Sequence, residues 1–117
     1  MIAVHFNTIT RDGGVMLNRK GSEISFSVEG HAGFDQKGSD IVCAAVSVLA
    51  QTAVIAINRI AGIHQRIEQR EGFLKSVLEI DEDDGRTEVL RIILATMIIG
   101  LDEIVKVYPE RLVITYR

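Results

Sequence analysis

Alternation of apolar and polar positions predicts two strands near the start of the chain. In residues 2–7 and 23–29, large apolar side chains occupy every second position. Successive side chains of a strand point to opposite faces, so such a segment has one buried face. Between the two segments, turn signals at residues 12–14 and 20–21 flank a short possible strand around residues 15–17. The pattern predicts a meander that opens the domain.

The long uncharged segment that follows predicts a buried helix. Residues 41–58 carry no charge and are too long for one typical strand. We expect Ser39 or Asp40 to cap the helix and Gly62 to end it. A membrane span fits less well, because the run is only marginally long and contains the polar residues Ser47, Gln51, Thr52 and Asn58. A core helix is expected, with one face available to a second subunit.

The second half of the chain predicts a strand, a helix and a closing strand. Residues 73–80 read as a strand, 81–85 as a turn, and 90–105 as a helix with apolar residues at helical spacing. Pro109 ends this helix, and residues 112–116 form the last strand. The order β-β-α-β-α-β, with strands grouped before the first helix, predicts an α+β fold: two layers, a mainly antiparallel sheet and two main helices.

Composition and charge narrow the class of protein. A chain of 117 residues that is 47% hydrophobic suits a single domain over residues 1–117. A net charge of −3 provides no positive field, so no direct nucleic-acid partner is expected. The single cysteine cannot form an internal disulfide, and the first residues lack the pattern of a secretion signal. We expect a cytoplasmic protein that does not associate with membranes.

The only cysteine, Cys43, is the first candidate for chemistry. If Ser39 or Asp40 caps the helix, Cys43 lies in the first turn, where unpaired N–H groups and the helix dipole favour a thiolate. The same amides could hold the oxyanion that forms when a thiolate attacks a carbonyl. Cysteine is also among the most frequently buried residues, so inert packing is the alternative. Cys43 alone does not decide between them.

His31 is the second candidate. It directly follows the strand of residues 23–29 and Gly30, which can turn the chain away from the sheet. An imidazole near a thiol can deprotonate it and later protonate the leaving amine. A surface histidine at the end of a strand is the alternative. Spacing alone leaves both interpretations open.

Two neighbours have candidate supporting roles. Asp40 could cap the helix or orient His31, although its carboxylate would by itself oppose a thiolate. Ser47 lies four residues after Cys43 on the same helix face, where its hydroxyl could support the site or bond back to the carbonyl of Cys43. The intervening loop could hinge over a bound peptide, and its candidate residues are Ala32, Gly33, Phe34 and Gly38.

Other motifs are excluded on chemical grounds. Residues 33–38 have the glycine spacing of a phosphate loop, but Ser39-Asp40 follows where lysine and a hydroxyl residue are required. The acidic run 81–85 lacks the ligand spacing of a calcium loop, so we predict no metal site there. His5 and His64 are expected to be ordinary exposed histidines without a role.

The stretch GHAGFDQKGSDIVCAAVS (residues 30–47) resembles the bacterial ribosomal-processing cysteine protease family, often called Prp. The resemblance rests on residues 30–32, Gly38, residues 40–45 and Ser47, and it extends over essentially the whole chain. It implies a small α+β homodimer that removes the amino-terminal extension of a large-subunit ribosomal protein. It also implies that Cys43 is the nucleophile, that His31 is the general base and acid, and that no cofactor is required.

The roles of Asp40 and Ser47 do not follow from the resemblance, although both match its motif. A second hypothesis is a non-catalytic, dimeric, ribosome-associated interaction module in which Cys43 belongs to the core. The uncharged helix and the lack of a demonstrable third catalytic residue motivate it.

Overall fold

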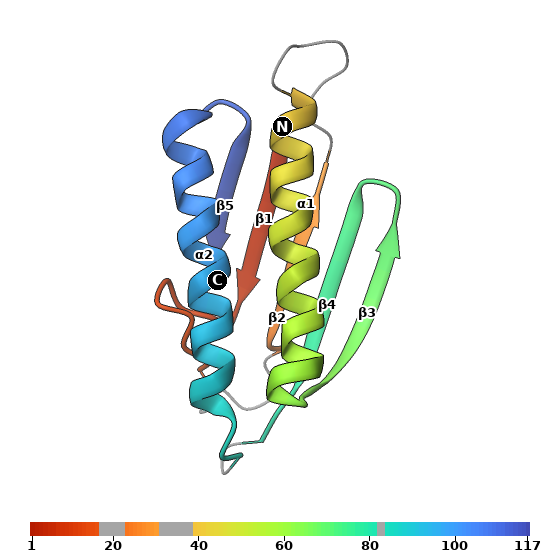
Figure 1. Cartoon of the computed structure of the whole chain (residues 1–117), viewed down its shortest axis with the longest axis vertical. Helices are drawn as coiled ribbons and strands as arrows, with labels where there is room; N and C mark the ends of the chain where they lie inside the picture. The colour runs from red at the N-terminus through yellow and green to blue at the C-terminus, as the bar shows by residue number, and fades with distance from the viewer. Residues whose placement is uncertain (17–22, 31–38, 82–83) are drawn as a thin grey trace.

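The structure is a computed structural model, and it describes residues 1–16, 23–30, 39–81 and 84–117. Its elements follow in the order β1 (Ile2–Asn7), β2 (Ser25–Glu29), α1 (Ser39–Ala56), the π-helical segment η1 (Ile57–Ala61), β3 (His64–Arg70), β4 (Phe73–Glu79), α2 (Thr87–Val107) and β5 (Leu112–Tyr116). The strands form one sheet in the order β3-β4-β2-β1-β5. The two helices lie side by side on one face of this sheet (Figure 1).

The pairing of the strands confirms the predicted α+β class. Strand β2 pairs antiparallel with β1 and β4, and β3 pairs antiparallel with β4, whereas β5 pairs parallel with β1. A parallel pair needs a long crossover, and here the chain passes through α2 before it returns as β5. The sheet is therefore mainly antiparallel, and the helices form the second layer.

The core lies between the sheet and the two helices. Register brings Val4 opposite Val28 and Phe6 opposite Phe26, so the apolar residues of the alternating pattern face the same side. The inner side of α1 contributes four buried small or branched residues, namely Val42, Val46, Ala50 and Ala53. The helices touch closely at Gly100, where a Cβ atom would lie 2.8 Å from Cδ2 of Leu49. Close packing of this kind fixes the position of α1 against α2.

Strand β3 corrects the predicted order of elements. We expected the charged segment that contains His64 to be a connection, but residues His64–Arg70 form an edge strand, and the order is β-β-α-β-β-α-β. Its residues are almost all exposed, because β3 lies at the edge of the sheet to the side of α1 (Figure 1). An edge strand with polar side chains on both faces has no period-two apolar signal.

The bounds of α1 modify the prediction at its start and confirm it at its end. The helix begins at Ser39, so Asp40 is its second residue rather than its cap, and the capping position lies outside the described residues. At the other end, η1 continues the helix to Ala61. Gly62 then adopts a left-handed conformation with φ 65°, as predicted for a glycine that ends a helix.

The predictions for the remaining segments mostly hold. Helix α2 ends at Val107, directly before Tyr108 and Pro109. Of the short possible strand at residues 15–17, only an antiparallel bridge between Val15 and Ile9 is present within the described residues, which stop at residue 16 there.

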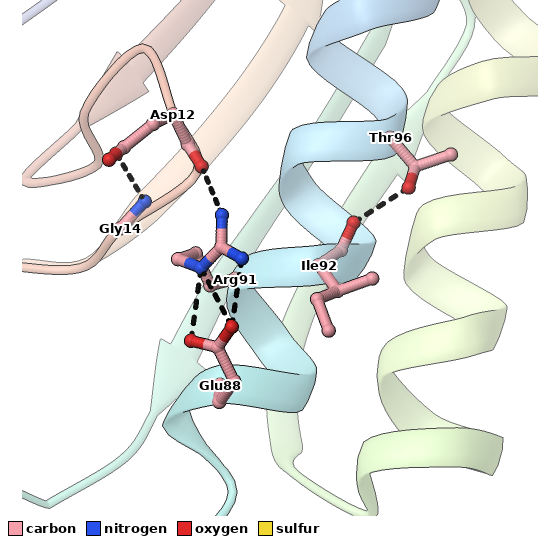
Figure 2. A network of polar contacts seen from close by, with 6 residues as sticks. All are labelled: Asp12, Gly14, Glu88, Arg91, Ile92 and Thr96. Atoms are coloured by element: carbon pink, nitrogen blue, oxygen red, sulfur yellow. Dashed lines mark hydrogen bonds and ion pairs between the residues drawn. The ribbon is translucent and has the colours of Figure 1, made fainter.

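The turn that follows β1 is joined tightly to α2. At Gly13, with φ 85°, a Cβ atom would lie 2.5 Å from the carbonyl oxygen of Arg91 and 2.7 Å from the amide nitrogen of Ala95. Figure 2 shows Arg91 between the carboxylate of Glu88 and the carbonyl oxygen of Asp12, to which its Nη1 atom donates over 3.3 Å. Only glycine allows the main chain of the turn to approach the helix this closely.

Residues Ile41–Ala61 have the length and composition of a membrane-spanning helix, with a mean hydropathy of 2.1, and 28% of that window is buried. Length and composition are weak support for a span, because a core helix of a globular protein meets the same criteria. The inner side of this helix packs on the sheet, while Ile41, Val48 and Ile55 on its outer side are exposed. The helix therefore has one partnered face and one apolar face that is open.

Candidate active site

Cys43 lies near the start of α1 and faces a cavity. It is the fifth residue of the helix, just beyond the first turn in which we expected it. The influence of the helix dipole is strongest within that turn and declines beyond it. The residue is half-buried, packs against the edge of the core and lines the cavity. A thiol at the boundary between core and cavity is accessible to a ligand, whereas an inert core cysteine is not.

The cavity has a volume of about 270 Å³ and lies between α1 and the sheet. Its lining is mostly apolar; the apolar contributors from the two layers are Ile2, Val28, Val46, Ala50, Phe73 and Leu74. Ser47, Gln51, Gln69 and Arg70 add polar groups. An apolar hollow with a few polar groups is the usual form of a binding site for a small molecule or a side chain.

Gly30 brings the end of β2 to the same cavity. Its φ of 100° lies in the region that favours glycine, and a Cβ atom would lie 2.5 Å from the carbonyl oxygen of Met1. Its N–H group donates a hydrogen bond of 2.9 Å to the carbonyl oxygen of Gly72. Gly30 and Cys43 both line the cavity, so the predicted proximity of the strand end and the helix start is confirmed.

The tip of the β3–β4 hairpin forms the outer wall of the cavity. The guanidinium carbon of Arg70 lies 4.0 Å from the centroid of the Phe73 ring. Its Nη1 atom also lies 2.6 Å from a carboxylate oxygen of Glu68, but both side chains are largely exposed, so this ion pair adds little stability. Stacking on the ring holds the cation at the mouth of the cavity.

Ser47 lies on the cavity side of α1, one turn after Cys43. Its Oγ atom accepts a hydrogen bond of 2.9 Å from Nε2 of Gln51. Within the described part of the chain, this is the only polar contact of the Ser47 side chain, so the bond back to the carbonyl of Cys43 is not formed. The hydroxyl proton of Ser47 is therefore not committed to the helix backbone.

Several predicted site residues cannot be placed. His31 and the predicted substrate loop lie outside the described residues, and for Asp40 only the helical backbone is described; the loop residues concerned are Ala32, Gly33, Phe34 and Gly38. Of the two remaining histidines, His64 begins β3 and is exposed as expected, whereas His5 lies within β1 with a side chain only 21% exposed, which corrects the expectation of an exposed residue. His5 lies 3.1 Å from a carboxylate oxygen of Glu29, and His64 lies 3.8 Å from one of Glu79.

Sequence reasoning did not identify the hairpin side of the site. Gln69, Arg70 and Phe73 line the cavity, but the first two belong to the strand that was not predicted. Gln51 could have been found, because it continues the row that begins with Cys43 and Ser47 at intervals of four residues. In the part of the chain that the structure describes, no cluster of three or more His, Cys, Asp or Glu residues could hold a metal ion.

The fold and the cavity together define a class. A small two-layer α+β domain presents a thiol beside an apolar cavity, at the junction of a helix start and a strand end. Thiol-dependent enzymes place their nucleophile at such an edge of a rigid scaffold. This arrangement is typical of a thiol-dependent hydrolase that receives part of a substrate in the cavity.

Comparison with known proteins identifies a particular family within this class. Residues 14–113 match the family described as cysteine protease Prp, and the chain belongs to this family. The ribosomal processing cysteine protease Prp of Bacillus subtilis (strain 168) is 30% identical over 94 residues, which cover 79% of this chain and 84% of that protein. The protein is therefore a member of a family of cysteine proteases, which favours the enzyme over the non-catalytic module.

Solved structures agree with the assignment. The fold resembles that of the essential ribosomal processing protease Prp from S. aureus in complex with a covalently linked product peptide, with a TM-score of 0.72, 25% identity and coverage of 100% of both chains. SMU.848 from Streptococcus mutans is similar, with a TM-score of 0.67 and 25% identity over 99% of this chain and 93% of that one.

Proposed function

We propose that this protein cleaves peptide bonds with Cys43 as the nucleophile and His31 as the general base and acid. The observation that carries the proposal is the position of Cys43, half-buried at the start of α1 and open to the cavity. His31 follows Gly30 directly in the sequence, and Gly30 lines the same cavity. His31 is therefore adjacent in sequence to a wall residue of the cavity that Cys43 also lines, and an imidazole beside a thiol can act as its base.

The proposed reaction is acyl transfer. The thiolate of Cys43 attacks the carbonyl carbon of the scissile peptide bond, and its proton passes to His31. The tetrahedral oxyanion is stabilised by N–H groups at the start of α1. Collapse of this intermediate breaks the C–N bond, and His31 protonates the departing amine. Water then hydrolyses the thioester, which releases the acid and restores the thiol.

The cavity supports an apolar peptide segment as the substrate. Its floor is apolar, and a volume of about 270 Å³ is sufficient for one large side chain. We infer that the substrate is the amino-terminal segment of a large-subunit ribosomal protein, because relatives are named ribosomal processing proteases. A cytoplasmic location is part of this proposal, since that is where such a segment would meet the enzyme.

The assignment is tested with a peptide that spans the amino-terminal region of the host's large-subunit ribosomal protein, with products identified by mass spectrometry. Cys43→Ala should remove cleavage altogether, because no other cysteine is present. His31→Ala should reduce it by a factor of about a hundred or more. Cleavage that persists in Cys43→Ala would show that the catalytic assignment is wrong.

Alkylation of Cys43 separates the enzyme from an inert thiol. If His31 activates the thiol, iodoacetamide should react faster than with a simple thiol such as glutathione, and His31→Ala should slow the reaction. Circular dichroism of both variants serves as the folding control. A rate equal to that of glutathione, unchanged by His31→Ala, would favour the non-catalytic module.

We propose further that the protein is a homodimer that uses the open face of the helices. Ile41, Val48 and Ile55 are exposed at intervals of seven residues along α1, and Ile92 and Ile99 are exposed in the same way on α2. Contiguous exposed apolar area of this kind is typical of a protein interface. Analytical ultracentrifugation at micromolar concentration should give the dimer mass, and Val48→Glu should give the monomer. A monomer mass for the unmodified protein would contradict the proposal.

A further inference from the structure

The hydrogen bond between Gln51 and Ser47 fixes how the serine hydroxyl can act. A hydroxyl has one proton to donate and two lone pairs that accept. In Ser47 a lone pair receives the Nε2–H group of Gln51 over 2.9 Å. The proton is then directed away from Gln51, because the amide N–H group occupies the side of the oxygen that faces it.

The Ser47 hydroxyl lies at the wall of the cavity. Cys43, Ser47 and Gln51 follow one another at intervals of four residues along one side of α1, and all three line the cavity. No bond from Ser47 back to the helix backbone is present in the described part of the chain. A group bound beside Cys43 in this cavity can therefore accept the proton of Ser47.

We propose that Gln51 is a positioning residue that holds the Ser47 hydroxyl as a donor to a carbonyl oxygen of the bound peptide. This inference rests on the proposed function, because it needs a peptide next to Cys43. A carbonyl oxygen gains negative charge when the thiolate attacks, so a donor aimed at it acts mainly in the transition state. Loss of the orientation should therefore lower kcat rather than raise KM.

The sharpest test reverses the hydrogen bond without changing the size of the side chain. In Gln51→Glu the carboxylate accepts from Ser47, which draws the hydroxyl proton out of the cavity. We expect kcat to fall about tenfold, with KM changed less than about twofold. Gln51→Met, which leaves the hydroxyl free to rotate, should have a smaller effect of about threefold.

A matched control separates orientation from added charge. Asn58→Asp makes the same amide-to-acid exchange on an exposed residue seven positions further along the helical run, about 10 Å from Gln51. It should leave kcat within about twofold of the unmodified protein, since a charge at that distance is screened. The rate of Cys43 alkylation should be unchanged in Gln51→Glu. A parallel loss of alkylation and cleavage would overturn the inference, because it would place the effect on the thiol.

A double-mutant cycle completes the test. Ser47→Ala should lower kcat, and adding Gln51→Glu to it should cause no further loss, because the two residues act through one hydroxyl. Additive losses, an effect on KM alone, or no loss in Gln51→Glu would each overturn the role of Gln51. None of these outcomes affects the proposed function, which fails only if Cys43→Ala or His31→Ala leaves cleavage intact.

Discussion

Gly13 follows β1 and Gly30 follows β2, and the two places differ in the space that remains between sheet and helix. At Gly13 the turn touches the backbone of α2 and leaves no room for a Cβ atom. Near Gly30 and Gly72 the strand ends approach each other, but a cavity of about 270 Å³ remains beside α1. The same residue type therefore makes a rigid joint in one place and the rim of a binding site in the other.

Side chains of the two helices explain the difference. On α2, the joint is closed by Arg91, which links Glu88 to the main chain at Asp12 (Figure 2). On α1, three of the five residues that line the cavity are small, namely Cys43, Ser47 and Ala50. Small side chains opposite the hairpin tip leave space that the core does not fill. The contrast implies that stability depends mainly on the joint at Gly13 and activity mainly on the cavity beside Gly30.

The largest expected effect is on stability, for Gly13→Ala. The new Cβ would lie 2.5 Å from a carbonyl oxygen and 2.7 Å from an amide nitrogen, and φ is 85°. Backbone atoms cannot move aside cheaply, so we expect a loss of about 3 kcal/mol in the free energy of unfolding. Urea denaturation measures it. The control is Gly85→Ala, where no atom lies within 4 Å; equal losses in the two variants would contradict the proposed joint.

Gly30→Ala should have the next largest effect, a loss of about 2 kcal/mol in the free energy of unfolding. The new Cβ would lie 2.5 Å from the carbonyl oxygen of Met1, but this is the single backbone atom closer than 3 Å among the described residues, whereas Gly13 has two such contacts. Peptide cleavage should fall further than stability alone explains, since Gly30 precedes His31. The rate of peptide cleavage and the free energy of unfolding should both be measured on the same sample. Full activity with normal stability would show that the end of β2 does not position the site.

Phe73→Ala tests the cavity side with less effect on folding. Removal of the ring takes away an apolar wall and the support of Arg70, so we expect KM to rise about tenfold, or about 1.4 kcal/mol in binding. Phe73→Leu, which keeps an apolar side chain, should recover most of the loss. Steady-state kinetics with the apolar peptide measure the change. An unchanged KM in Phe73→Ala would place the peptide elsewhere.

The smallest expected effect is a dependence of stability on pH at the joint. The hydroxyl of Thr10, followed by the N–H group of Gly14, lowers the pKa of Asp12 below its ordinary value, and hydrogen bonds from Arg91 lower the pKa of Glu88. Such carboxylates add stability above their unfolded pKa values, and this stability is lost as pH falls through the lower folded values. The urea concentration at the unfolding midpoint should therefore become lower when the pH is reduced below about 4.

Asp12→Asn is the variant that sharpens this prediction. It should make the drop in the urea midpoint smaller, since it removes one of the two carboxyl groups at the joint whose pKa is lowered. A drop of the same size in Asp12→Asn would show that Asp12 does not contribute to the acid sensitivity.

Most of the fold could be predicted from sequence, because its buried strands and helices carry regular apolar patterns. Strand β1 alternates, α2 repeats its apolar residues at helical spacing, and Gly62 ends the first helical run. Strand β3 could not be predicted in this way. Its formation depends on backbone pairing with β4 and hardly on burial of its own side chains, so its sequence HQRIEQR carries no apolar period.

The site was predicted on one side only. Cys43, Ser47 and Gly30 could be found because helix spacing and a glycine after a strand are local signals. Phe73 and Arg70 could not, because they reach the cavity through the long-range pairing of β4 with β2 and of β3 with β4. The placement of Gln51 relative to Ser47 needed the structure as well, since only side-chain geometry shows which atom donates.

The charged character of β3 has a consequence for solubility. An edge strand presents unpaired backbone groups that can recruit a strand from another molecule. In β3, Arg66 and Glu68 on the outer edge are exposed and would have to be desolvated before such pairing. The charged side chains of β3, which prevented its prediction from the sequence, thus protect the protein from aggregation. Exchange of these two residues for valine would create an edge on which fibrils could nucleate.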